Sequence, residues 1–318
     1  MTSRKVVVTG GAGFIGSHLV DSLIERGDEV TVIDNFRTGK IEFVHKSANL
    51  IELDLKDVST IAEIFEGVDE VYHLAANADV QKGWDNPKRD LELNLVNTLL
   101  LANICASKRV GNFIFASTGS VYGEATVIPT PETFSIRQQT SLYGASKYSA
   151  ENFLGAYAHA GKFNVTIFRF VSVLGTRYTH GHIFDFVQRL KQDPTQLKVL
   201  GNGFQNKSYM HVSDCVRGVI GLRGANQFEI FNLGRPDSIV IRESIKIIAD
   251  SLKLAPNISY GDGASGWVGD NPLILLDVEK AKQGGWVPNT TISSAIEETV
   301  SWLVKNNWVF EKVKSDIE

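Results

Sequence analysis

Cysteine is scarce in this chain, and the way it is used excludes two kinds of site. Cys105 and Cys215 lie too far apart for the paired spacing of a zinc site, and one pair is no disulfide framework for 318 residues. The two histidines within residues 177–182 find no further ligand in suitable spacing beyond Asp185, so we expect no metal site. This cysteine usage fits a reducing compartment, and we expect a cytoplasmic protein.

The sequence also lacks long hydrophobic runs and an excess of one charge. No apolar run reaches the roughly 20 residues needed to span a bilayer, and residues 5–8 already begin an expected strand, so neither a membrane segment nor a signal peptide is predicted. With 32 basic and 36 acidic residues, the chain has no basic footprint for nucleic acid. A hydrophobic content of 43% suffices for one large domain or two closely packed ones.

A glycine-rich turn, Thr-Gly-Gly-Ala-Gly-Phe-Ile-Gly at residues 9–16, stands between an apolar run and an amphipathic stretch. In a strand–turn–helix context, Gly10 permits the tight turn, Gly13 lets the backbone approach a pyrophosphate, and Gly16 lets the helix pack closely on the strand. The next expected strand ends at Asp34, 18 residues after Gly16, where a carboxylate can bond ribose hydroxyls and repel a 2′-phosphate. The pattern predicts an NAD site; the alternative is a glycine turn without a ligand.

Up to about residue 175, strand-like and helix-like segments alternate, which predicts βαβ units and a doubly wound, mostly parallel α/β sheet of the Rossmann type. The NAD-binding domain is expected to comprise residues 1–174 and about 212–247. A smaller substrate lobe, of residues 175–211 and 248–318, is expected to close over the carboxyl edge of the sheet. Strands are predicted at 5–8, 29–33, 50–53, 70–73, 112–116, 165–170 and 229–233, and helices at 17–25, 58–65, 87–107, 142–158 and 212–222.

A second chemical signal is Tyr143-Gly-Ala-Ser-Lys147. Residues four apart on a helix share one face, so the lysine cation, together with the positive nicotinamide of an oxidised cofactor, should lower the pKa of the phenol and let Tyr143 act as a general base. Thr118, in the cluster 117–120 at the end of an expected strand, would hold the reacting hydroxyl at the ligand-binding edge of the sheet. The alternative for this hydroxyl cluster is a helix cap or a turn.

Together, the glycine turn, Asp34-Asn35, His73-Leu-Ala-Ala76, the 117–123 segment and Tyr143–Lys147 resemble the extended short-chain dehydrogenase/reductase family. Within it, the chain is most similar to nucleotide-sugar epimerases of the UDP-glucose 4-epimerase type, and the similarity continues through residues 201–214 and 266–270. The resemblance implies that Tyr143 is the base and that Lys147 binds the nicotinamide ribose. It implies that Asp54 and Leu55 contact adenine, that Ala75 and Ala76 line the cofactor site, and that Asn94 supports the active-site network. The NAD-binding residues expected on these grounds are Gly10, Gly13, Phe14, Ile15, Gly16, Asp34, Asn35, Asp54, Leu55, Leu74, Ala75, Ala76, Asn94, Ser117, Tyr143 and Lys147.

The two residues after Thr118 separate the reactions of this family. Resembling sugar-nucleotide dehydratases carry an Asp-Glu pair there, because elimination of water needs an extra acid and base. The decarboxylases typically have Glu at the second of these positions. This chain has Gly119 and Ser120. The pattern favours 4-epimerisation through a transient 4-keto sugar.

Three positions depart from the family's substrate motifs. Ser172 stands where the family usually has Asn, Ser265 where it usually has a diphosphate-binding Arg, and Lys207 where it usually has Arg. Lys207 keeps the charge but loses the bidentate fork. Arg177 begins a loop whose cations would face phosphates or a sugar carboxylate, unless that loop is merely a solvated polar one. The expected substrate-binding residues are Thr118, Gly119, Ser120, Tyr143, Ser172, Arg177, Lys207 and Ser265.

The sequence therefore predicts an NAD-dependent nucleotide-sugar 4-epimerase of the UDP-glucose/UDP-galactose type. Two alternatives stay open: a dehydrogenase, reductase or decarboxylase acting on a related nucleotide sugar, and a catalytically idle NAD-binding regulator. The resemblance also implies a homodimer, formed by two helices that pair with their copies. Their expected interface residues are Leu93, Val96, Leu99, Leu100, Phe153, Leu154 and Tyr157.

Overall fold

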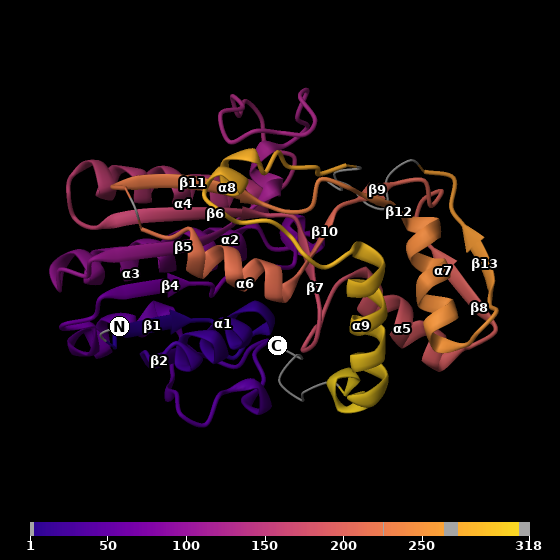
Figure 1. Cartoon of the computed structure of the whole chain (residues 1–318), viewed down its shortest axis with the longest axis horizontal. Helices are drawn as coiled ribbons and strands as arrows, with labels where there is room; N and C mark the ends of the chain where they lie inside the picture. Colours follow the sequence, from indigo (N-terminus) through magenta and orange to yellow (C-terminus); the bar gives the residue numbers. More distant parts are fainter. Residues whose placement is uncertain (1–2, 225, 264–272, 312–318) are drawn as a thin grey trace.

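The computed structural model describes residues 3–224, 226–263 and 273–311 and contains a seven-stranded, fully parallel sheet (Figure 1). The strand order is β11-β6-β5-β4-β1-β2-β3, so the chain winds outward from β1 in one direction and then in the other. This confirms the predicted doubly wound fold and the predicted return of the strand near 229–233 to the sheet, beside β6. The strands are β1 (Lys5–Thr9), β2 (Glu29–Asp34), β3 (Asn49–Glu52), β4 (Glu70–His73), β5 (Asn112–Thr118), β6 (Asn164–Phe170) and β11 (Phe228–Leu233).

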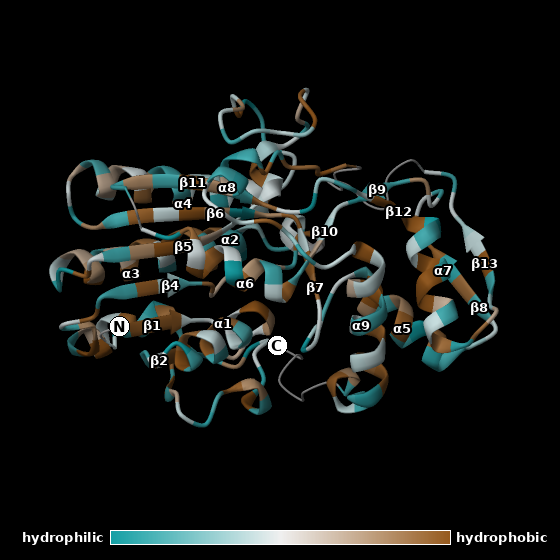
Figure 2. Cartoon of the chain, viewed as in Figure 1, coloured by the Kyte–Doolittle hydropathy of each residue, from teal (hydrophilic) through white to brown (hydrophobic). Residues whose placement is uncertain are grey.

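Helices cover both faces of the sheet, and the alternation of side chains along the strands supplies a core to each. On β1, Val6 and Val8 belong to the core under α1 and α6, whereas Val7 belongs to the core under α3 and α4. Figure 2 shows the corresponding run of hydrophobic residues along the central strands. The helices are α1 (Phe14–Glu25), α2 (Pro87–Asp90), α3 (Asn97–Ser107), α4 (Leu142–His159) and α6 (Val212–Gly221).

Two predicted helices differ in type from an ordinary α-helix. The segment predicted at 58–65 is a 3₁₀ helix over Leu55–Phe65 with a non-helical residue, Ile61, inside it. The long helix predicted at 87–107 contains a π-helical segment, Leu91–Val96, between α2 and α3. The periodicity of apolar residues does not distinguish these helix types, because their numbers of residues per turn are too similar to be separated over one or two turns. Shorter 3₁₀ turns cover Ile41–Phe43, Gln81–Trp84, Gly119–Tyr122 and Asn307–Phe310.

A smaller lobe lies beyond the carboxyl ends of the strands, at the right of Figure 1. Its helices α5, α7 and α9 pack on one another, and short strand pairs β8–β13 and β7–β10 (parallel) and β9–β12 (antiparallel) surround them. Helix α7 extends across residue 247, where the predicted division between domains falls, and packs on α9; the division itself remains a prediction. The elements are β7 (Ser172–Leu174), α5 (His182–Gln192), β8 (Gln196–Val199), β9 (Asn206–Lys207), β10 (Tyr209–His211), β12 (Ile239–Val240), α7 (Ile241–Leu252), β13 (Asn257–Tyr260) and α9 (Ile292–Lys305). Helix α8 (Glu279–Gln283) packs instead on β11 of the large sheet (Figure 1).

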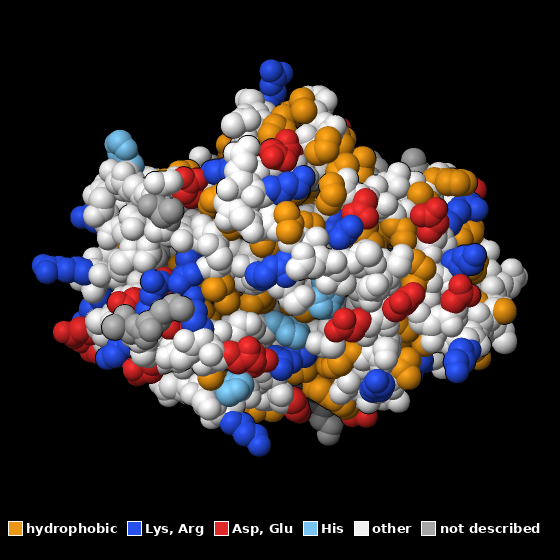
Figure 3. All heavy atoms as spheres, in the orientation of Figure 1, with side chains coloured by type: hydrophobic (Ala, Val, Ile, Leu, Met, Phe, Trp, Pro, Cys, Tyr) orange, Lys and Arg blue, Asp and Glu red, His pale blue; other side chains and the backbone are white. Residues whose placement is uncertain are grey.

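Between the 3₁₀ turn after β5 and α4, the chain projects from the body of the molecule, at the top of Figure 1. Hydrophobic side chains gather on this projection in Figure 3, and Val127 and Ile128 are 51% and 46% exposed. Elsewhere on the face shown, acidic and basic side chains are interspersed. The base of the projection is fixed where the Thr130 N–H donates to the Leu275 carbonyl at 2.8 Å.

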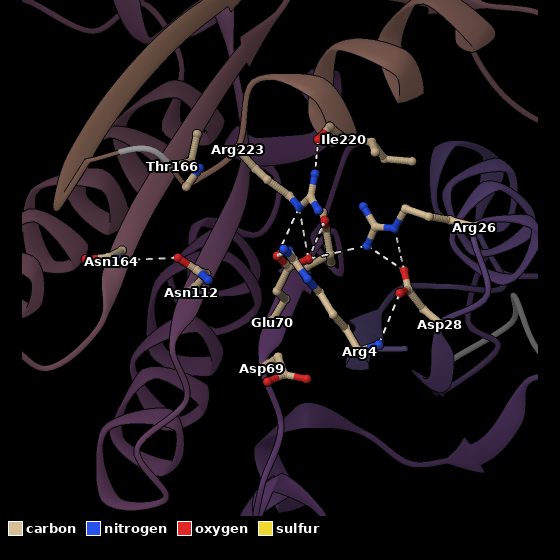
Figure 4. A network of polar contacts seen from close by, with 12 residues as sticks. Arg4, Arg26, Asp28, Asp69, Glu70, Asn112, Asn164, Thr166, Ile220 and Arg223 are labelled. Carbon is tan, nitrogen blue, oxygen red and sulfur yellow. Dashed lines mark hydrogen bonds and ion pairs between the residues drawn. The ribbon is translucent and has the colours of Figure 1, made fainter. Parts of the chain in front are cut away.

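At the amino edge of the sheet, opposite to the lobe, a buried carboxylate gathers three arginines (Figure 4). Glu70 on β4 pairs with Arg4, which precedes β1, with Arg26 at the end of α1, and with Arg223 just after α6. The Tyr72 hydroxyl also donates to Glu70 Oε2 at 2.9 Å. This arginine–Glu70 cluster ties the residues that adjoin β1, α1 and α6 to the start of β4.

Candidate functional site

In the glycine turn, the backbone segments lie too close together to leave room for a side chain at two of the glycines. Gly10 has φ +73°, and a Cβ there would lie 2.7 Å from the Ala75 nitrogen; a Cβ on Gly16 would lie 2.1 Å from the Gly10 oxygen. Helix α1 begins directly after Gly13, and no described side chain caps its first turn. Its first amides and the positive end of its dipole are therefore available to an anion such as a pyrophosphate.

Asp34 ends β2 beside this turn, as the sequence predicted for a ribose-binding acid. Its carboxylate accepts hydrogen bonds from the Ala12 N–H at 3.0 Å and the Phe36 N–H at 2.9 Å, and it is 8% exposed. Burial raises the pKa of Asp34, and these amide bonds oppose the rise. The Asn35 amide donates to Asp54 at 3.0 Å, whereas Leu55 is buried in the core, at 5% exposure.

The end of β4 is held against the glycine turn by a buried histidine. His73 lies between Thr9 Oγ1, 2.7 Å from Nδ1, and Thr98 Oγ1, 2.8 Å from Nε2. Burial lowers the pKa of His73 to about 3, so the ring is neutral. Because the Ala75 N–H also donates to Thr9, at 3.4 Å, the 74–76 backbone is fixed beside Gly10, where cofactor contacts were predicted.

Asn94 stands on the π-helical segment and joins it to the helix of the predicted base. Its Oδ1 accepts from the Asn77 N–H at 2.7 Å, and its Nδ2 donates to Ser146 Oγ at 3.0 Å. The side-chain nitrogens of Asn77 and Asn94 (Nδ2) both donate to Asp90 Oδ1, at 2.8 and 3.2 Å. Segments of π-helix occur frequently at functional sites. Asn94 was predicted as a supporting residue, whereas Asn77, Asp90 and Ser146 were not; their pairing depends on three separate segments.

Thr118, Tyr143 and Lys147 converge at the carboxyl end of β5. Thr118 is the last residue of β5 and accepts from the Ser120 N–H at 3.1 Å. Ser141 caps α4 by accepting from the Gly144 N–H at 3.0 Å, so the helix begins where Tyr143 faces Thr118. Lys147 is 2% exposed, and its Nζ lies 4.0 Å from the centre of the Phe115 ring.

The electrostatic effect on Tyr143 differs from the prediction. Burial raises the pKa of Tyr143 to about 12, opposed by its hydrogen bond with Thr118. Burial likewise lowers the pKa of Lys147 to about 7, and the charge of Glu151 opposes that change. In the protein alone, burial of the phenol therefore prevails, and the expected decrease in its pKa does not occur. The part of the prediction that depends on the nicotinamide cation of bound NAD stays a prediction.

Glu151 lies one helical turn beyond Lys147 and was not predicted. Ser117 Oγ donates to its Oε1, and the Arg169 guanidinium on β6 binds both of its oxygens, with Nε 3.1 Å from Oε1. The side chains of Glu151 and Arg169 are each 3% exposed. The signal was the continued spacing of four residues from Tyr143 through Lys147. Ser117, predicted to bind the cofactor, uses its hydroxyl in this pair.

The predicted substrate residues are placed in several environments. Gly119 is buried, and a Cβ there would lie 2.7 Å from the Ile274 side chain; Ser120 follows it, half-buried. Ser172 is exposed at the start of β7 and pairs with Tyr209 on β10. Lys207, on β9, precedes Tyr209 in the chain by two residues. Ser265 lies outside the described residues.

Arg177 is engaged by an acid from the sheet domain. Its Nη2 lies 2.7 Å from Asp21 Oδ2 on α1, and its guanidinium carbon lies 5.9 Å from the centre of the Phe43 ring. Its φ of +61° is unusual for a side-chain-bearing residue. The arginine thus joins the beginning of the lobe to α1, and a role toward phosphate remains a prediction.

The fold and the glycine–Asp34 geometry define a dinucleotide-binding protein of the doubly wound class. Residues 6–234 match the NAD dependent epimerase/dehydratase family, and the chain belongs to this family. A putative UDP-glucose 4-epimerase of Methanocaldococcus jannaschii is 30% identical over 95% of this chain and 99% of its own. UDP-glucuronic acid decarboxylase 1 of Arabidopsis thaliana is 34% identical over 93% of this chain and 69% of its own.

Solved structures agree with this assignment. A UDP-galactose 4-epimerase superposes with a TM-score of 0.87 at 37% identity, over 96% of this chain and 100% of the other. A UDP-glucose 4-epimerase of Thermus thermophilus in complex with NAD gives a TM-score of 0.84 at 31% identity, over 95% and 99% of the two chains. The protein is therefore an NAD-dependent enzyme that acts on nucleotide sugars.

The described part of the chain fits NAD at the cradle formed by Gly10 and Gly16, the uncapped start of α1 and Asp34. Within the same residues, no group of three or more His, Cys, Asp or Glu side chains is arranged to hold a metal ion. The described helices include none that is both long enough and apolar enough to cross a membrane.

Proposed function

We propose that the protein is a UDP-sugar 4-epimerase that interconverts UDP-glucose and UDP-galactose. The observation that carries the proposal is the Thr118–Tyr143–Lys147 arrangement at the carboxyl edge, followed by a position with little room for a side chain. At Gly119 any side chain would meet Ile274 and the Phe170 carbonyl, at 2.7 and 3.2 Å from its Cβ. With Ser120 next, the site has the residues for redox chemistry at one carbon and lacks the acid pair of a dehydratase at these two positions.

In this proposal, Tyr143 removes the proton from the sugar 4-hydroxyl while Thr118 holds that oxygen. NAD, when bound, supplies the hydride acceptor and then the hydride donor for C4. Tyr143 returns the proton after the 4-keto sugar has turned its other face to the site. The protonated ammonium of Lys147 favours the phenolate of Tyr143. Because the pKa of Lys147 is about 7, this ammonium is still populated near neutral pH.

The same proposal assigns contacts to the cofactor and to the substrate. The start of α1 would hold the pyrophosphate, Asp34 the adenosine ribose, and Lys147 the nicotinamide ribose. Asp54, beside Asn35, would approach adenine. For the diphosphate of the substrate, Lys207 and Ser172 on neighbouring strand pairs are the proposed contacts, together with Ser265.

Decarboxylation of UDP-glucuronic acid is the second candidate, because relatives named for that reaction reach 35% identity. Ser120, where the decarboxylases typically carry Glu, favours the epimerase. The test is to incubate the protein with UDP-glucose, UDP-galactose or UDP-glucuronic acid and follow the sugars by ¹H NMR. We expect C4 epimers to interconvert with no net NADH; release of carbon dioxide from UDP-glucuronic acid would establish the decarboxylase instead. A net accumulation of NADH would indicate a dehydrogenase, and no turnover on any of the three would favour the regulator.

We also propose a homodimer through the outer faces of the π-helical segment, α3 and α4. Leu91, Val96 and Phe153 are 49%, 40% and 48% exposed there, which leaves apolar surface for a self-complementary contact. Leu154, predicted in this interface, is instead fully buried against the sheet, because it lies about 100° around α4 from the exposed Phe153.

A further inference from the structure

Helix α4 carries three polar side chains on the face toward the sheet, at intervals of one turn. Tyr143, Lys147 and Glu151 are spaced by four residues, so they lie on one face of the helix. Lys147 and Glu151 are 2% and 3% exposed. The proposed function gives a role to Tyr143 and to Lys147 and none to Glu151.

The carboxylate of Glu151 is fixed from two neighbouring strands. Ser117 on β5 donates to Oε1, and Arg169 on β6 donates through Nε to Oε1 and through Nη2 to Oε2. Arg169 is in turn held over the Tyr122 ring, with its guanidinium carbon 4.7 Å from the ring centre. A carboxylate bound on both oxygens has a fixed position, and here that position is one helical turn from Lys147.

We propose that Glu151 is a positioning residue that, held by Arg169 and Ser117, keeps the buried Lys147 protonated beneath Tyr143. This inference rests on the proposed function for the role of Lys147 in turnover. The surroundings of Lys147 offer no equivalent charge among the described residues. Phe115 on β5 contributes a ring, and His73 on β4 is neutral because of its burial. Tyr143 on α4 is protonated because burial raises its pKa, and the cation of Arg169 on β6 is paired with the Glu151 carboxylate.

The test is Glu151→Gln, which keeps the shape of the side chain and removes its charge. The alkaline limb of the pH–rate profile, where Lys147 loses its proton, should move to lower pH by about one unit, and activity should recover as the pH is lowered. A purely structural role would lower activity by the same factor at every pH. Glu70→Gln is the matched control, since it neutralises another buried, arginine-bound glutamate and should leave the alkaline limb in place.

A second measurement reads Lys147 without turnover. The difference in unfolding free energy between a protein and its Lys147→Met counterpart changes slope with pH where Lys147 titrates in the folded state. Because the folded pKa is lowered to about 7 from an ordinary value of 10.5, this difference should change in favour of the lysine protein as the pH rises above about 7. In the Glu151→Gln background the change should begin about one pH unit lower.

If Glu151→Gln does not fold, Glu151→Asp serves, since it keeps the charge but withdraws it by one methylene. We then expect a shift in the same direction, of less than one unit. An unmoved onset in the unfolding measurement for either folded variant overturns the inference. If wild-type protein turns over no nucleotide sugar while the onset still shifts, the proposed function fails and the influence of Glu151 on Lys147 stands.

Discussion

The two ends of one sheet each hold a buried glutamate bound by arginine, and they differ in what the pair adjoins. Glu70 at the amino edge is 1% exposed and takes three arginines whose side chains are 46%, 19% and 15% exposed. Glu151 at the carboxyl edge takes one arginine that is 3% exposed. The first cluster joins element ends near solvent; the second is enclosed beside Lys147 and Tyr143.

This comparison indicates that the position in the fold, more than the type of ion pair, determines the role. In a parallel sheet the carboxyl edge receives the helix N-termini and the ligands, so a charge fixed there acts on chemistry. For a charge fixed at the amino edge, we expect an effect on stability.

The largest effect on turnover is expected from Tyr143→Phe, which removes the ionisable oxygen and keeps the ring. Turnover should fall by at least about 10²-fold, with the melting temperature nearly unchanged, because the base is lost and the packing is not. Steady-state epimerisation and calorimetric melting check both parts. The control is Tyr72→Phe at the amino edge, which loses the bond to Glu70 and should cost about 1–3 kcal/mol of stability while turnover persists. A Tyr143→Phe enzyme of near-normal rate would remove Tyr143 from the mechanism.

The largest effect on stability is expected from Glu70→Ala. Three arginines would lose their shared partner, and Arg223, bound through Nε to both oxygens at 3.0 Å, would be affected most. We expect the free energy of unfolding to fall by about 3 kcal/mol, at the lower end for a broken buried pair because the arginines reach solvent. Urea unfolding measures the loss of stability, and the kcat of the folded fraction should equal that of the wild type. A selective loss of kcat with unchanged stability would mean that the amino edge influences chemistry.

The same comparison shows what could be predicted from sequence. The glycine turn, Asp34 and the spacing of Tyr143 and Lys147 are local patterns in the chain, and each was placed at the carboxyl edge as expected. Glu151 and Asp90 were missed because their roles depend on partners from other strands and segments, such as Arg169 and Asn77. The rise in the pKa of Tyr143 was missed for a related reason: burial arises from the whole packed structure and cannot be read from spacing.

An intermediate effect is expected at the cofactor end of the carboxyl edge. Asp34→Ala should weaken NAD binding by roughly 10- to 100-fold and reduce the discrimination against NADP, since the ribose-binding carboxylate and its charge are both removed. Calorimetry of nucleotide-free protein with each cofactor measures this. Asp54→Ala, which removes the bond from Asn35 but leaves Asp34 in place, is the control and should change NADP discrimination little. Tighter binding of NADP than NAD by the wild type would contradict the assignment.

The smallest effect on the chemistry is expected on the outer side of α4, the helix whose inner side carries Glu151. Phe153 is 48% exposed, and Phe153→Glu would place a charge at the centre of the proposed twofold contact and repel its own copy. We expect light scattering to change from a dimer to a 35 kDa monomer at micromolar concentration, while the affinity for NAD changes less than about threefold. Ile128→Glu on the projecting segment, where the side chain is 46% exposed, is the control and should leave the mass unchanged. A wild-type protein that is already monomeric would refute the interface, whereas a dimer dissociated only by Ile128→Glu would move the contact to the projection. Since Glu151 faces inward on the same helix, a monomeric Phe153→Glu protein with an unshifted alkaline limb would show that the charge on Lys147 depends on packing within one subunit.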